Sequence, residues 1–142
     1  NFSIHQVFLD GLLQVSPTVR KYYKISEIIR MQVMLVKEYK AAWKRFQSSQ
    51  LFNEGELDHL QNVYNQLFKE SLRQLDDLTI VITEGQLRMN DDERIHAIDQ
   101  IYTSLSGRIT FLRQFNNQTS VLLLQRVKET GDAKGVERLY LK

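Results

Sequence analysis

The feature that most constrains the fold is the stretch from Asn90 to Thr130, which has the pattern of one long amphipathic helix. Asn90 is followed three places later by Glu93, the spacing of a capping box at a helix start. Apolar residues then recur in alternating steps of three and four, which keeps one stripe facing a partner: Ile95, Ile98, Tyr102, Leu105, Ile109 and Leu112. Gly131 comes next and suits the left-handed position that ends many helices. A helix over 91–130 spans about 60 Å, so the sequence predicts an elongated molecule.

The preceding residues predict a first long helix over 17–49. Ser16 followed by Pro17 is a typical helix start, because Pro fits the first helical position. The apolar stripe of this helix would comprise Tyr22, Ile25 or Ile29, Val33, Val36, Tyr39, Trp43 and Phe46.

A second long helix is predicted over 54–83, where Asn53 and Glu56 repeat the capping-box spacing. Its seam would comprise Leu57, Leu60, Tyr64, Leu67, Leu75, Leu78 and Ile82. The β-branched run from Thr79 to Thr83 could also form a strand, but it follows a helical pattern and no partner strand is visible. We therefore expect helix there.

The expected fold class is all-α: an elongated antiparallel bundle of three long helices, because short connections usually join antiparallel neighbours. Residues 1–142 would form a single domain. The apolar residues 1–16 would form a short helical segment that packs on the bundle or continues an upstream region. Residues 132–142 would form a short C-terminal helix or tail that docks on the bundle. After Leu112 the seam weakens, since Asn116 and Thr119 come next in register. Either the helix changes face or kinks there, or it extends beyond its partners; a continuous helix with a changed face is preferred.

Charge and composition exclude several kinds of site. The net charge is only +2, but residues 18–50 carry +6 and residues 51–83 carry −4, so antiparallel packing would let the two segments complement each other. The absence of cysteine excludes disulfides, thiol catalysis and cysteine-ligated zinc. Glycines are isolated, so no phosphate-binding loop is present. Apolar runs are too short for a transmembrane helix.

Two Glu-x-x-His motifs, Glu56 with His59 and Glu93 with His96, invite comparison with di-iron bundles. Both glutamates, however, occupy capping-box positions. At 100° per residue, Glu93 and His96 point away from the seam, and antiparallel helices would start about 45 Å apart. We expect no metal, no cofactor, no catalytic residue and no small-molecule substrate.

A nucleic-acid-binding role is the alternative that the basic first helix raises, through Lys37, Lys40, Lys44 and Arg45. The interleaved aromatic residues follow the apolar spacing, which makes them core residues first. The candidate interaction surface combines these four basic residues with three from the region where the third seam weakens: Arg113, Asn116 and Asn117.

Several segments of the chain also resemble a known family. They are Leu87 to Ile95, Ile98 to Tyr102, Arg113, the turn from Leu51 to Leu57 and the ending Val136 to Tyr140, together with the Lys/Tyr-rich first helix. Over about residues 18–141 the chain is similar to the small helical conjugal-transfer proteins of Bacteroidetes conjugative transposons, called TraI-type or likened to the TrbJ proteins of conjugative plasmids.

This resemblance implies a non-enzymatic structural component of a type IV secretion (mating-pair) apparatus. Such a component would be exported with a signal peptide that is later removed, and would be periplasmic or secreted. Its partners would be other transfer-apparatus proteins or further copies of itself, with at most peripheral membrane contact. The family supplies no catalytic or ligand motif, so no functional residue is carried over.

Overall fold

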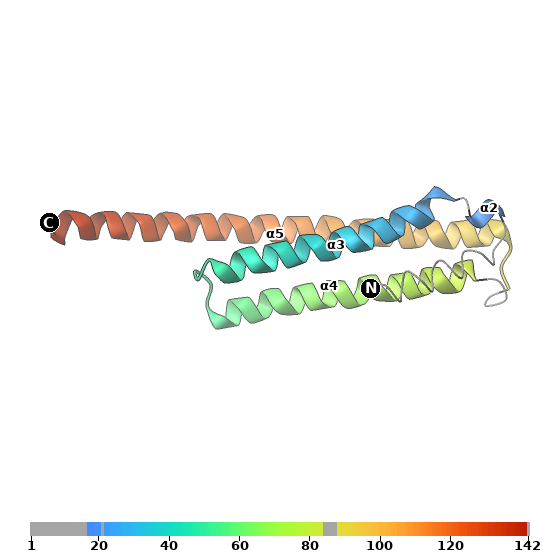
Figure 1. Cartoon of the computed structure of the whole chain (residues 1–142), viewed down its shortest axis with the longest axis horizontal. Helices are drawn as coiled ribbons and strands as arrows, with labels where there is room; N and C mark the ends of the chain where they lie inside the picture. The colour runs from blue at the N-terminus through green and yellow to red at the C-terminus, as the bar shows by residue number, and fades with distance from the viewer. Residues whose placement is uncertain (1–16, 21, 84–87, 142) are drawn as a thin grey trace.

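The computed structural model describes residues 17–20, 22–83 and 88–141, and within these ranges all regular structure is helical. The helices are α2 (Pro17–Arg20), α3 (Tyr23–Ser48), α4 (Glu54–Ile82) and α5 (Asp91–Leu141). Figure 1 shows α3, α4 and α5 lying side by side along one long axis. The predicted apolar segment at 1–16 lies outside the described residues.

The three long helices run up, down and up. Lys24 contacts Asp99, and Arg113 contacts Glu38, both pairs being separated by 75 positions in sequence. A constant separation means that α3 and α5 run parallel. Along α4 the partners run in the opposite order, since Glu56 pairs with Arg126 and Glu70 with Arg108. The predicted antiparallel arrangement of successive helices is therefore confirmed (Figure 1).

The predicted first helix over 17–49 is wrong at its start, because the helix is interrupted between α2 and α3. Tyr22 has an extended backbone (φ −67°, ψ 116°) that no helix interior allows. Its hydroxyl donates a hydrogen bond to Asp99, and the Lys24 ammonium lies 3.1 Å from the same carboxylate. Val19 in α2 is fully buried. Tyr22 and Lys24 thus attach the start of α3 to α5, and α2 also contacts α5.

The predicted stripe of α3 is only partly correct. Ile25 and Phe46 are buried as predicted, but Val33, Val36 and Trp43 are only half-buried. The other buried residues of this helix are Ile28, Met31, Gln32, Leu35 and Ala42. Apolar residues cover about half of this helix, so periodicity alone allows two adjacent stripes. Packing against both α4 and α5 decides between them, and it centres the core on the stripe that contains Leu35.

Helix α4 follows its prediction. The Asn53 side-chain oxygen accepts a hydrogen bond from the Glu56 amide at 2.8 Å, and the Asn53 amide donates to the Glu56 carboxylate at 2.9 Å. This is a complete capping box, which satisfies two amides that the helix itself leaves unpaired. Six of the seven predicted seam residues are buried, Leu57 being half-buried. The run from Thr79 to Ile82 is helical, as expected.

Helix α5 begins with the predicted capping box between Asn90 and Glu93. Its seam is buried at Ile98, Leu105, Ile109 and Leu112 and half-buried at Ile95 and Tyr102. The predicted end at Thr130 is wrong, as is the separate segment at 132–142, because α5 continues to Leu141. Glycine within a helix costs only about 1 kcal/mol relative to Ala. That cost does not end the helix here.

The polar stretch after Leu112 does not interrupt α5, so the predicted continuous helix is confirmed. The predicted change of face is wrong, because the half-buried residues after Leu112 continue the same stripe. Asn116 stays in register and accepts a hydrogen bond from the Tyr64 hydroxyl at 2.6 Å. The Thr119 hydroxyl bonds back to the Phe115 carbonyl at 2.9 Å. The seam therefore continues with polar residues that have partners of their own.

Beyond Arg126, α5 extends past the turn that joins α3 and α4. Arg126 contacts Leu51, in the turn between α3 and α4. The following residues, from Val127 to Leu141, extend past that turn by about 22 Å at 1.5 Å per residue. Figure 1 shows this part of α5 projecting from the end of the bundle.

Candidate functional site

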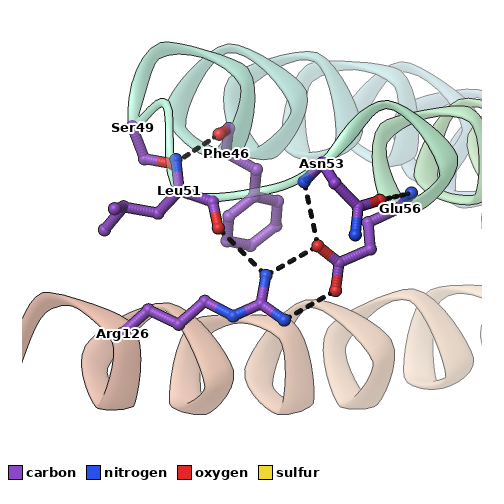
Figure 2. Close-up of polar contacts among 6 residues, drawn as sticks. All are labelled: Phe46, Ser49, Leu51, Asn53, Glu56 and Arg126. Carbon is purple, nitrogen blue, oxygen red and sulfur yellow. Dashed lines mark hydrogen bonds and ion pairs between the residues drawn. The ribbon is translucent and has the colours of Figure 1, made fainter. Parts of the chain in front are cut away.

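The turn between α3 and α4 is fastened to α5 by Arg126 (Figure 2). Its guanidinium donates to both oxygens of Glu56 at 2.7 Å and to the Leu51 carbonyl at 2.9 Å, and lies 5.3 Å from the Phe52 ring centre. These bonds, with that from the Asn53 amide, lower the pKa of Glu56 to about 2. The two-oxygen geometry is the one in which Arg binds carboxylates most firmly.

The turn itself needs a conformation that non-glycine residues rarely adopt. Gln50 has φ 59°, in the left-handed region. The adjacent Ser49 hydroxyl donates to the Phe46 carbonyl at 2.7 Å and accepts from the Leu51 amide at 3.2 Å, as Figure 2 shows. These bonds stabilise the tight reversal and present the Leu51 carbonyl to Arg126.

The two Glu-x-x-His motifs do not come together. They lie at the starts of α4 and α5, at opposite ends of the bundle (Figure 1). Glu56 is held by Arg126 and its capping box, while Glu93 is exposed and caps its own helix. His59 packs against the Phe115 ring, and His96 is exposed. Across the described ranges, no three His, Asp or Glu side chains form a group that could hold a metal ion.

No ion pair joins α3 to α4, although both helices are fully described. Their charges are met by α5 instead. Arg108 pairs with Glu70 of α4 at 2.5 Å, and Arg113 pairs with Glu38 of α3 at 3.1 Å. The ion pairs that join the long helices to one another therefore all involve α5.

An apolar groove runs between α4 and α5. It consists of two hollows of about 520 and 640 Å³ that meet at His59. Phe111 stacks on Phe115 along its α5 side and remains 49% exposed. Gly107 contributes no side chain, and a Cβ there would meet open space. The other apolar lining residues are Phe52, Leu60, Val63, Leu67 and Leu122.

A polar groove of about 370 Å³ lies between α3 and α5, and it contains four of the seven predicted surface residues. Its lining comprises Glu38, Ala41, Ala42, Arg45, Arg113, Asn116 and Asn117. Arg45 is exposed and lies 3.4 Å from the Ser120 hydroxyl. Asn116 is half-buried and held by Tyr64, so it is a packing residue as much as a surface one.

The other three predicted residues, Lys37, Lys40 and Lys44, are exposed and do not line this groove. At 100° per residue they follow the side of α3 opposite its buried stripe. We call these three lysines together with Arg45 and Arg113 the basic face. Their role as an interaction surface stays a prediction.

Sequence reasoning missed Arg126 and the apolar groove. Phe111 lay one position from the predicted seam, so it could be counted with the core. Arg126 carries no motif, although it stands four places before Thr130 on the seam side of the helix. An exposed aromatic residue beside a seam is the one signal that could have revealed the groove.

Comparisons with protein-family models, with curated proteins and with solved structures found no match to this chain. Among the described residues, no helix combines the length and the apolar character needed to cross a membrane.

Proposed function

We propose that this protein is a non-enzymatic interaction subunit of a conjugative DNA-transfer apparatus, and that it binds other subunits through its helix faces. The apolar groove between α4 and α5 supports the mode of action. The assignment to a conjugative transfer apparatus is supported by a resemblance to conjugal-transfer proteins in Leu87 to Ile95 and the neighbouring segments. An exported, periplasmic location belongs to the same proposal.

The apolar groove has the properties of a helix-binding site. An amphipathic helix binds by laying its apolar face into a groove between two others. Phe111 offers a large exposed ring, which is the kind of side chain that contributes most to protein interfaces. Gly107 leaves space for a partner backbone to approach. A partner helix placed there would complete a four-helix arrangement along the bundle.

The far half of α5 adds a second apolar surface. Val121, Leu124 and Val127 are exposed, Leu124 by 67%. Beyond Arg126 the helix projects past the described parts of α3 and α4 (Figure 1), and isolated helices of this length are marginally stable in water. Contact with another transfer protein, or with a second copy, would stabilise it.

The groove is tested by Phe111→Ser, with Ile80→Ser as its matched control. Ile80 is 42% exposed on α4 and does not line the groove. Each variant is introduced into donor cells that carry the full set of transfer genes. We expect Phe111→Ser to lose an identified transfer protein from affinity purification and to lower mating frequency, while Ile80→Ser retains both. Circular dichroism confirms that both variants remain folded.

The proposal fails if deletion of the gene leaves mating frequency unchanged and the purified protein carries no other transfer protein. Equal losses for Phe111→Ser and Ile80→Ser would reject the groove as the binding site. They would still be compatible with a role in the transfer apparatus. Gly107→Trp gives an independent check, because it fills the groove without removing any existing contact.

A further inference from the structure

We propose that the basic face is a binding surface for the phosphate backbone of DNA. This inference concerns a different side of the bundle from the apolar groove and does not depend on it. It rests on an excess of charge, on the polar character of the surface and on the side chains present.

Positive charge is concentrated on the basic face. Its five cationic side chains and the single carboxylate of Glu38 give +4, whereas the whole chain carries +2. The rest of the chain is therefore net −2. Within α3, the side chains of Lys37, Lys40 and Lys44 form no ion pair with any described residue. Uncompensated charge on one side of a molecule attracts polyanions.

The arrangement suits an extended polyanion better than a single small anion. Lys37 and Lys44 are separated by about 10 Å along α3, with Lys40 between them. That length matches about three steps of one DNA strand at 3.4 Å of axial rise. Arg45 of α3 and Arg113 of α5 add two guanidinium groups in the polar groove. Several consecutive phosphates could therefore be contacted at once.

The chemistry of the surface favours DNA over an acidic protein or a membrane. The polar groove offers only Ala41 and Ala42 as apolar lining residues, and no exposed aromatic or aliphatic anchor. Protein interfaces depend on such anchors, and interfacial membrane binding needs an apolar face to insert. Protein–DNA interfaces are instead polar and positively charged. Guanidinium and amide groups, present in Arg45, Arg113 and Asn117, suit phosphate oxygens.

The experiment measures binding of the full chain to a fluorescent mixed-sequence DNA duplex of about 30 base pairs, at 50 and 200 mM NaCl. If about four phosphates are neutralised, affinity should fall on the order of 10²-fold between these salt concentrations. The variant Lys37→Ala/Lys40→Ala/Lys44→Ala should weaken binding at 50 mM at least tenfold and should reduce the salt slope by about three. Ala substitutions preserve helix propensity, so the fold is retained.

The matched control is Lys69→Ala/Arg73→Ala/Arg88→Ala, which removes three exposed charges elsewhere. Both triple variants remove three positive charges, so both lose the same general attraction to DNA. Apart from that shared loss, the control should bind DNA with an affinity within about twofold of the wild-type protein. Equal weakening by both triple variants would overturn the proposal, since the binding would then depend on net charge alone. Absence of DNA binding at 50 mM salt would also overturn it. Equally tight binding of polyglutamate would assign the face to an acidic protein.

Discussion

The hydrogen bond from Tyr64 to Asn116 explains why a polar residue can occupy the seam of α5, and a double-mutant cycle tests it. Tyr64 is buried in α4, and its hydroxyl donates to the Asn116 side chain at 2.6 Å. Burial raises the pKa of Tyr64 to about 12, so the hydroxyl stays a donor throughout the ordinary pH range. The variants are Tyr64→Phe, Asn116→Leu and their combination.

The expected costs follow from what each variant leaves unpaired. Tyr64→Phe removes one hydrogen bond, worth about 0.5–1.5 kcal/mol. Asn116→Leu leaves a buried hydroxyl without its partner, which costs about 1–3 kcal/mol. The double variant leaves neither group, so it should be about 1 kcal/mol more stable than the sum of the single effects predicts. That coupling exceeds the roughly 0.3–0.5 kcal/mol within which independent mutations add.

Urea unfolding followed by circular dichroism at 222 nm supplies the free energies. The free energy of unfolding must fall with urea concentration at the same slope for all four proteins. The urea concentrations at the midpoints of unfolding then report stability alone. Additive single effects would refute the reasoning, because they would mean that the hydroxyl and the amide do not interact. A double variant less stable than the sum would refute it as well.

Three further predictions concern the fastening at Glu56, the register of α3 and the projecting part of α5. Because Arg126 lowers the pKa of Glu56 from 4.5 to about 2, the stabilisation is complete above pH 4.5 and is lost as pH falls towards 2. The stability difference between wild type and Glu56→Gln should therefore shrink over that interval; a constant difference in acid unfolding curves would contradict this. Leu35→Ala should lower the free energy of unfolding by about 2–5 kcal/mol. Val36→Ala should lower it by clearly less, because only Leu35 is fully buried. The reverse order in urea unfolding would favour the stripe predicted from the sequence, which contains Val36. Native-state hydrogen exchange should be much faster from Gly131 to Leu141 than from Ile98 to Leu112, since the former segment projects past the described parts of α3 and α4; equal protection would mean that it is covered.

The helix starts were predictable because they depend on local chemistry. Asn53 with Glu56, and Asn90 with Glu93, have side chains that satisfy their own helix amides, so no distant contact is needed. The seam of α4 was also readable, since its apolar residues follow one narrow stripe. These features are encoded within a few residues of each other, where sequence patterns are most informative.

The errors arose where distant contacts decide the outcome. The break at Tyr22 depends on Asp99, 77 positions away in sequence. The choice of the stripe containing Leu35 depends on how two other helices approach α3. The continuation of α5 through Gly131 shows that a glycine alone does not end a helix, so the end depends on the rest of the fold. No local pattern contains that information.

The basic face and the apolar groove also differ in how far they could be predicted from the sequence. The basic face was predictable, because a row of lysines at helical spacing lies on one side of any helix. The apolar groove was not, because it forms only where α4 and α5 meet and leave Phe111 uncovered. Arg126 likewise acquires its role from the turn at Leu51, 75 positions earlier in the sequence.

The central claim, that the groove beside Phe111 binds another transfer protein, is tested most directly by site-specific photo-crosslinking in mating donor cells. A photoreactive amino acid replaces Phe111 in one strain and Ile80 in another, and mass spectrometry identifies the products. We predict a discrete crosslink from position 111 to a protein encoded with the transfer genes, or to a second copy of this chain, and none from position 80. The same products from both positions, or none from position 111, would contradict the claim.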